Sequence, residues 1–121
     1  MASSVLLVDD DGDIRDVVAQ ALRGAGYKVR VTSNGAQALV ALEETTPELV
    51  LLDLMMPQLG GWQFLEILEA NPRYAKIPVV IITASREEVR DRPVLRKPFD
   101  LDALLRAVEA SGSKAPAASA P

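Results

Sequence analysis

The side chains best suited to chemistry in this chain stand directly after its apolar runs. Carboxylates follow the first and third runs, a hydroxyl group follows the fourth, and an ammonium group comes shortly after the fifth. These residues are Asp9, Asp10 and Asp11, then Asp53, Thr83 and Lys97. Carboxylate oxygens bind hard cations such as Mg²⁺, and a carboxylate can also attack phosphorus. Hydroxyl and ammonium groups can hydrogen-bond or neutralise phosphoryl oxygens.

Several carboxylates gathered in one small volume need a positive charge beside them. Two carboxylates about 4 Å apart repel each other by roughly 4 kcal/mol at an effective dielectric constant near 20. A divalent cation, with Lys97 as a fixed charge opposite, would remove that repulsion. Mg²⁺ usually takes one or two carboxylates together with waters and phosphate oxygens. One carboxylate would then remain available as a nucleophile.

Each of these residues also has an ordinary structural interpretation. An aspartate after a strand often caps a helix or forms a turn, and we expect this of Asp11, which precedes Gly12. A threonine after a strand often caps the next helix, and a Lys-Pro pair usually lies in a loop. The joint pattern, with suitable chemistry after four runs in this order, is much more specific than any one member.

The elements that position these side chains follow from the spacing of the apolar residues. Apolar runs at 5–8, 49–52, 79–82 and 94–95, with a weaker run at 29–31, are typical of parallel strands buried on both faces. Helical periodicity occupies most of the intervals between them and the stretch after the last one. The alternation predicts an α/β, doubly wound, five-stranded parallel sheet in the order 2-1-3-4-5. In that order the first and third strands are neighbours, so their acidic ends would share one pocket.

Composition excludes several classes of function. The 121 residues contain no Cys and no His, which removes thiol and imidazole chemistry and the metal sites built on them. A net charge of −4 argues against direct binding to nucleic acid, and no apolar run is long enough for membrane insertion. We therefore expect a cytoplasmic protein. Residues 1–110 are expected to form one domain, and residues 111–121, rich in Ala, Pro and Ser, a flexible tail or linker stub.

Taken together, the motifs resemble those of response regulator receiver domains, the phosphorylation-controlled switches of two-component signalling. The matching stretches are Val8-Asp9-Asp10-Asp11, Asp53-Leu54-Met55-Met56-Pro57, Gly60-Gly61, Thr83-Ala84 and Lys97-Pro98-Phe99. The resemblance covers about residues 4 to 110. It implies a flavodoxin-like receiver fold of the chemotaxis-regulator type, and a regulatory phosphoacceptor rather than an enzyme. Such a domain assists its own phosphorylation and dephosphorylation.

The resemblance also implies a role for each residue at the phosphorylation site. Asp53 would accept a phosphoryl group, and Thr83 would swing to contact it, while the small Ala84 would leave the site open to the phosphodonor. Lys97 would pair with Asp53 or with its phosphate, and the Lys97–Pro98 peptide bond would be cis.

Metal and partner follow from the same resemblance. The cofactor would be Mg²⁺, bound by Asp9, Asp10, Asp53 and the backbone carbonyl of Met55, with Asp10 the more direct ligand of the first two. The phosphodonor would be a histidine kinase or a histidine phosphotransfer protein. Because this chain has no histidine, the partner must supply the phosphohistidine.

Two departures from the family pattern leave other functions open. Val94 stands where the family usually has the aromatic partner of the threonine switch. Only residues 84–96 separate Thr83 from Lys97, so we expect the fourth helix to be short or missing. These departures allow an alternative, a phosphorylation-independent protein-interaction module. A phosphatase with an aspartyl nucleophile is a further alternative, although the chain has no room for a cap domain.

Overall fold

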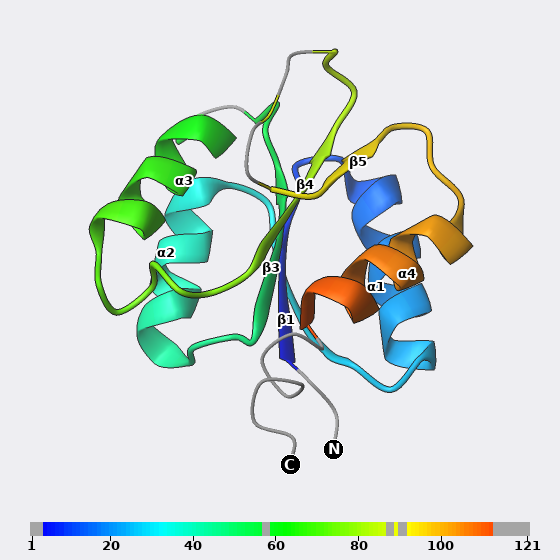
Figure 1. Ribbon diagram of the computed structural model, residues 1–121, viewed down its shortest axis with the longest axis horizontal. Coiled ribbons are helices and arrows are strands. Elements are labelled where there is room, and N and C mark those ends of the chain that lie inside the picture. The colour runs from blue at the N-terminus through cyan, green and yellow to red at the C-terminus, as the bar shows by residue number, and fades with distance from the viewer. Residues whose placement is uncertain (1–3, 57–58, 87–88, 90–91, 113–121) are drawn as a thin grey trace.

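Five strands and four helices make up the described part of the chain, residues 4–56, 59–86, 89 and 92–112 of the computed structural model (Figure 1). Strands and helices alternate as far as the fourth strand. In chain order the elements are β1 (Ser4–Val8), α1 (Gly12–Gly24), β2 (Lys28–Thr32), α2 (Gly35–Glu44), β3 (Leu49–Asp53), α3 (Gly61–Ala70), β4 (Val79–Thr83), β5 (Val94–Arg96) and α4 (Leu101–Gly112).

The strands form one parallel sheet in the order β2-β1-β3-β4-β5, which confirms the predicted topology. Strand β3 is buried along its whole length, and so is β4, as continuous apolar runs require. The edge strand β2 is mostly exposed, and valines alternate with polar side chains along it. Since β1 pairs with both β2 and β3, the carboxyl ends of β1 and β3 lie side by side at the point where the chain direction across the sheet reverses.

Two helices cover each face of the sheet. Figure 1 shows α2 and α3 on one side and α1 and α4 on the other. On the first side, alternate strand residues such as Leu52 and Ile81 pack against Phe64 of α3. On the second side, their neighbours in the strands pack against Leu22 of α1 and Leu104 of α4. The sheet therefore contributes side chains to two separate hydrophobic cores, one on each face.

Capping residues begin three of the helices, and one of them, Asp11, was expected from the sequence. Asp11 accepts hydrogen bonds from the backbone N–H groups of the first turn of α1, at 3.0 and 3.2 Å. Asn34 and Asp100 do the same for α2 and α4, at 2.9 and 2.7 Å. Such caps satisfy donors that a helix cannot satisfy internally. After α1 the chain turns through Gly26, whose φ of 100° is a conformation that favours glycine.

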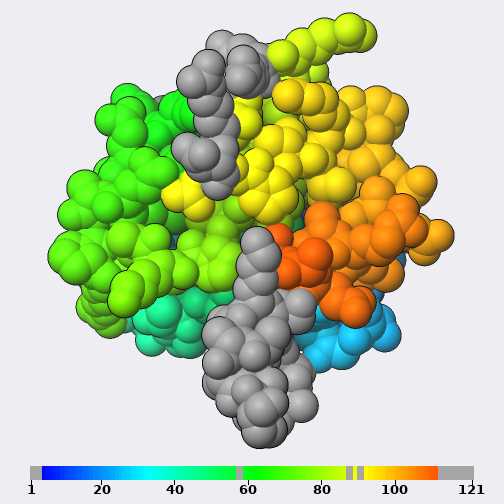
Figure 2. All heavy atoms as spheres, viewed as in Figure 1, coloured from blue at the N-terminus to red at the C-terminus, as the bar shows by residue number. Residues whose placement is uncertain are grey.

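The connection between β4 and β5 is the irregular part of the fold. It carries no helix in residues 84–86, 89 and 92–93, the part of the connection that the structure describes. Val89 packs on the α2–α3 side of the sheet, and Arg92 forms an ion pair with Glu69 of α3 at 2.8 Å. The yellow segment that carries β5 reaches the surface between α3 and α4 (Figure 2). The expectation of a short or missing fourth helix agrees with this arrangement.

Helix α4 runs to Gly112, two residues beyond the boundary suggested by composition. Ser111 is only 8% exposed and continues the core-facing row of Leu104 and Val108. Residues 113–121 of the expected tail lie outside the described residues. Within the described part of the chain, none of the helices is both long and apolar enough to cross a membrane.

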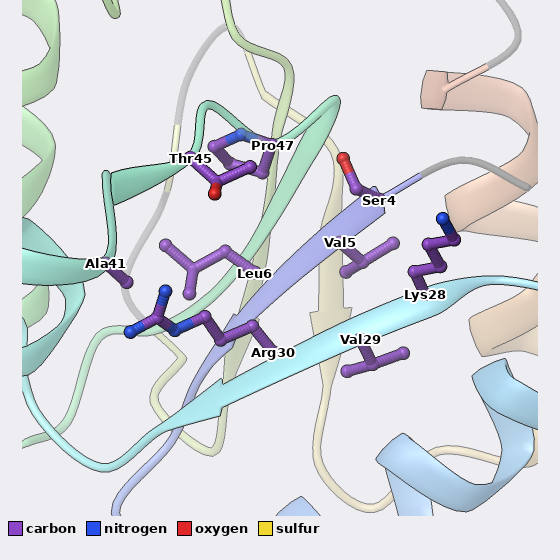
Figure 3. A pocket seen from close by; sticks show the side chains of 9 residues that line it. All are labelled: Ser4, Val5, Leu6, Lys28, Val29, Arg30, Ala41, Thr45 and Pro47. Atoms are coloured by element: carbon purple, nitrogen blue, oxygen red, sulfur yellow. The ribbon is translucent and has the colours of Figure 1, made fainter. Parts of the chain in front are cut away.

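The described surface has a hollow of about 230 Å³ at the amino-terminal ends of β1 and β2 (Figure 3). Leu6, Ala41 and Pro47 form much of its apolar floor, and Lys28 and Arg30 also line it. It lies at the edge of the sheet opposite the predicted acidic pocket, so it plays no part in that site.

Candidate functional site

The predicted acidic residues and Lys97 converge at the carboxyl edge of the sheet. Carboxylate oxygens of Asp9, Asp10 and Asp53 all lie within 4.8 Å of one another. The Lys97 Nζ atom lies 3.1 Å from Asp9 Oδ2 and 3.5 Å from Asp53 Oδ2. Thr83 ends the neighbouring strand, and its carbonyl accepts a hydrogen bond from the Lys97 N–H at 2.8 Å.

Asp9 is the most deeply placed member of this acidic cluster, with an exposure of 0%. Its Oδ1 atom accepts a hydrogen bond from the Asp11 N–H at 2.9 Å. Its Oδ2 atom accepts no hydrogen bond from the described residues, although Lys97 lies close enough for an ion pair. A fully buried carboxylate oxygen with a single electrostatic contact is under-satisfied and can accept a further positive charge.

Asp53 is held at both of its carboxylate oxygens. Its Oδ1 atom accepts a hydrogen bond from the Met55 N–H at 2.9 Å, and its Oδ2 atom faces Lys97. Burial, together with the nearby Asp9 carboxylate, raises the pKa of Asp53 to about 7, against the opposing effects of the Met55 N–H and Lys97. The raised pKa favours the neutral form of Asp53 in the metal-free site.

Lys97 remains charged between the two buried carboxylates. Burial alone would lower its pKa, but attraction to Asp9 and then to Asp53 outweighs burial and raises the pKa. Both pKa values are raised, which favours charged Lys97 and neutral Asp53. One cause explains both: a single ammonium cannot neutralise two carboxylates, and it lies nearer Asp9. The cluster keeps a surplus of negative charge.

These donors fit a hard divalent cation. All three side chains offer carboxylate oxygens, the ligands that Mg²⁺ prefers, and Asp9 Oδ2 lacks a hydrogen-bond donor among the described residues. Asp10 is exposed, which leaves its carboxylate free to turn toward an ion from the solvent side. The surplus charge would be neutralised by such an ion. The described residues thus fit the predicted metal.

Thr83 is fully buried at the end of β4, and its hydroxyl is engaged. The Oγ1 atom accepts a hydrogen bond from the Ser85 N–H at 3.0 Å. Ala84 is exposed, so nothing bulky stands at that position. The Lys97–Pro98 peptide bond is cis, as the resemblance implies. Val94 is half-buried and packs against the α2–α3 side of the sheet.

Two residues that support the site were given no role in it from the sequence. Arg15 donates a hydrogen bond from Nη1 to the Asp9 carbonyl at 3.0 Å, which clamps the loop that carries the acidic cluster. Gly61 begins α3 so close to β3 that a Cβ atom there would lie 2.5 Å from the Asp53 carbonyl oxygen. The Gly60-Gly61 pair was a visible signal for such a close approach, whereas contacts between an arginine and a backbone carbonyl leave no sequence pattern.

An apolar hollow of about 210 Å³ adjoins the site on its α1 side. Its lining combines residues of the first half of α1 with the segment from Lys97 to Leu101. Val17 and Leu101 are 52% and 43% exposed, which is unusual for large aliphatic side chains. The hollow therefore offers an apolar contact surface directly beside the acidic cluster.

Comparison with known proteins gives a consistent result. The family model described as response regulator receiver domain matches residues 5–109. The response regulator Rre1 of Synechocystis is 40% identical over 111 residues, which cover 84% of this chain and 48% of that protein. The DNA-binding response regulator MtrA of Mycolicibacterium paratuberculosis is 38% identical over 89 residues, which cover 74% of this chain and 38% of that protein. The chain thus spans less than half the length of either relative.

Solved structures agree in fold. The receiver domain of the sensor histidine kinase PA1611 from Pseudomonas aeruginosa superimposes with a TM-score of 0.85 at 25% identity. The match covers 93% of this chain and 99% of that one. That structure holds a magnesium ion coordinated in its active-site cleft.

Proposed function

This chain belongs to the response regulator receiver domain family, and we propose that Asp53 is its phosphoacceptor. The phosphoryl group comes from the phosphohistidine of a histidine kinase or histidine phosphotransfer protein. The observation that carries this proposal is the environment of Asp53. One of its carboxylate oxygens is fixed by the Met55 N–H, and the other faces Lys97 beside the Asp9 and Asp10 carboxylates.

The transfer is a substitution at phosphorus. A carboxylate oxygen of Asp53 forms the new O–P bond while the P–N bond to the partner's imidazole breaks. The bonding electron pair returns to the imidazole nitrogen, which takes up a proton. This attack requires the ionised form of Asp53, and its pKa of about 7 means that added positive charge favours the reaction.

Asp9 and Asp10, with Asp53 itself and the Met55 carbonyl, would hold Mg²⁺. The bound ion supplies positive charge to the phosphoryl oxygens and to the carboxylates. Arg15 keeps the Asp9 loop in place through the Asp9 carbonyl. Lys97 already lies 3.5 Å from Asp53 Oδ2, so its ammonium needs little movement to contact a phosphoryl oxygen there.

The phosphorylated form acts as a switch. The Thr83 hydroxyl turns toward the phosphoryl group and Lys97 contacts it, and together these contacts favour one of two conformations. The domain is a regulatory phosphoacceptor that promotes its own phosphorylation and dephosphorylation, not an enzyme with a separate substrate. We place it in the cytoplasm and assign it no direct contact with nucleic acid and no membrane insertion.

The hollow beside the site suits the phosphodonor protein. A partner that brings phosphohistidine to Asp53 must approach the carboxyl edge of the sheet, where α1 and the 97–101 segment form this apolar surface. Exposed Val17 and Leu101 would pack against apolar side chains flanking the partner's histidine.

Intact mass measurement tests the chemistry. Incubation with Mg²⁺ and acetyl phosphate should add one phosphoryl mass to the wild-type chain and to the control Asp102→Asn, which changes an exposed carboxylate at the start of α4. Asp53→Asn should gain nothing. A gain that survives Asp53→Asn, or no gain in the wild type, rules out the proposal.

A second pair of variants tests the docking surface. Val17→Asp should slow transfer from a phosphorylated kinase about tenfold or more, because it places a charge in an apolar contact. It should leave labelling by acetyl phosphate unchanged. The matched control Val40→Asp changes a valine on α2 that is 55% exposed and should affect neither reaction. Equal slowing by both variants would contradict this placement.

Val94 favours one alternative, a phosphorylation-independent interaction module. Without an aromatic ring at that position, the usual coupling of the threonine to the surface is missing. Partner binding that is unchanged in Asp53→Ala and unaffected by phosphorylation would support this alternative over the switch.

A further inference from the structure

The turn after β4 is held by two hydrogen bonds that meet at Ser85. The Ser85 N–H donates to Thr83 Oγ1 at 3.0 Å. The Ser85 carbonyl accepts a hydrogen bond from Nη1 of Arg96. Thr83 is fully buried, whereas Arg96 is exposed. A short series of hydrogen bonds therefore connects the buried hydroxyl to a cation on the surface.

The backbone around this turn is fixed by the sheet. Thr83 and Arg96 are register partners in the β4–β5 pair, and the Lys97 N–H donates to the Thr83 carbonyl at 2.8 Å. The ladder thus sets the backbone positions of Thr83 and Arg96. What can still change is the rotamer of Thr83, the turn at residues 84–85 and the side chain of Arg96.

Val94 cannot take part in such a change. Its branched side chain has few χ1 states and packs against the α2–α3 side of the sheet. Arg96 lies two residues further along β5, on the same face of the strand as Val94. It is long and exposed, and it is already bonded to the turn that follows Thr83. Arg96 is therefore the residue of β5 best placed to respond to Thr83.

We propose that Arg96 is the positioning residue that couples Thr83 to the exposed edge of β5. This inference rests on the proposed phosphorylation of Asp53. When the Thr83 hydroxyl turns to donate to the phosphoryl group, Oγ1 leaves the Ser85 N–H. The turn loses that anchor, the Ser85 carbonyl moves relative to Arg96, and the guanidinium group takes a new position on the surface.

The coupling acts in both directions. If the Arg96 contact with Ser85 favours the resting position of the turn, its removal makes Thr83 easier to reorient. Arg96→Ala should therefore bind the phosphoryl mimic beryllofluoride, in the presence of Mg²⁺, roughly three- to tenfold more tightly, the range expected for one exposed hydrogen bond. Arg96→Lys, which retains a cationic donor, should restore part of the difference. Arg106→Ala, an exposed arginine on α4, is the matched control.

Nuclear magnetic resonance tests the coupling in the wild type and in Arg96→Ala. In the wild type, Mg²⁺ and beryllofluoride should shift the Arg96 side-chain N–H signals and speed hydrogen exchange at the Ser85 amide several-fold. The Arg106 side-chain signals should not move. In Arg96→Ala without the mimic, exchange at Ser85 should already be faster than in the wild type.

The possible outcomes distinguish failure of the Arg96 coupling from failure of the proposed phosphorylation of Asp53. If Asp53 gains a phosphoryl mass and signals around Thr83 shift, but Arg96 and Ser85 do not respond, the coupling is refuted and the phosphoacceptor assignment stands. Unchanged beryllofluoride affinity in Arg96→Ala would refute the coupling as well. If Asp53 gains no phosphoryl mass and no signal responds to the mimic, both proposals fall together.

Discussion

Replacing Asp53 by asparagine should stabilise the metal-free protein, although it removes the residue proposed to carry the phosphoryl group. Asp53 is 2% exposed and faces a second buried carboxylate, Asp9. Its pKa rises from an ordinary value of 3.8 to about 7. A raised pKa means that the folded protein holds a proton that the unfolded chain has released, so stability falls as pH rises from about 4 to about 7.

The size of the effect follows from that pKa. A rise from 3.8 to about 7 corresponds to about 4 kcal/mol of instability above pH 7. Asparagine removes this charge at every pH. Its NH₂ group would face Lys97 and lose a favourable contact, which subtracts about 1 kcal/mol. The expected gain is therefore about 3 kcal/mol at pH 8 and about 1 kcal/mol at pH 5.

Urea denaturation in the presence of a chelator, at both pH values, measures this difference. Adding Mg²⁺ at about 100 times its Kd should then stabilise the wild type by about 2.7 kcal/mol, and the variant by much less. The reasoning is refuted if the variant is no more stable than the wild type at pH 8, or if it gains the same amount at pH 5. In either case, ionised Asp53 would not destabilise the metal-free fold as inferred.

Two further substitutions probe the support of the site. Lys97→Met leaves Asp9 buried without its cation and should cost about 3–5 kcal/mol in metal-free urea denaturation, with part recovered on adding Mg²⁺; a loss below about 1 kcal/mol would contradict the ion pair. Gly61→Ala places a Cβ atom 2.5 Å from the Asp53 carbonyl oxygen and should cost about 1–3 kcal/mol and slow phosphorylation. Gly24→Ala, where a Cβ meets nothing within 4 Å, should be neutral or slightly stabilising in both assays.

The topology was predictable because burial on both faces leaves continuous apolar runs in the sequence. The exact residues at which the strands end were less predictable. Thr32, Asp53, Thr83 and Arg96 are polar, yet each is the last residue of its strand. Ladder hydrogen bonds join backbone groups and do not depend on the side chain, so a polar residue can extend a strand by one position.

The convergence of the three aspartates and Lys97 was also predictable, since the carboxyl ends of parallel strands must meet at one edge. The distribution of charge within the site was not. Which carboxylate lies nearer Lys97 depends on differences of a few tenths of an ångström, 3.1 Å for Asp9 against 3.5 Å for Asp53. Arg15 and Arg96 each donate a hydrogen bond to a backbone carbonyl. Every residue has a carbonyl, so such contacts have no complementary partner visible in the sequence.

The site draws on both ends of the domain. Lys97 reaches back across 88 residues to Asp9 and 44 residues to Asp53. A chain emerging from the ribosome carries its acidic cluster early but gains the ammonium group only when β5 has been made. Until then, the cluster lacks the cation that neutralises part of its charge, and the strand that anchors Lys97 to Thr83 does not exist. The cluster therefore reaches its full charge balance only after Lys97 has been synthesised and β5 has joined the sheet.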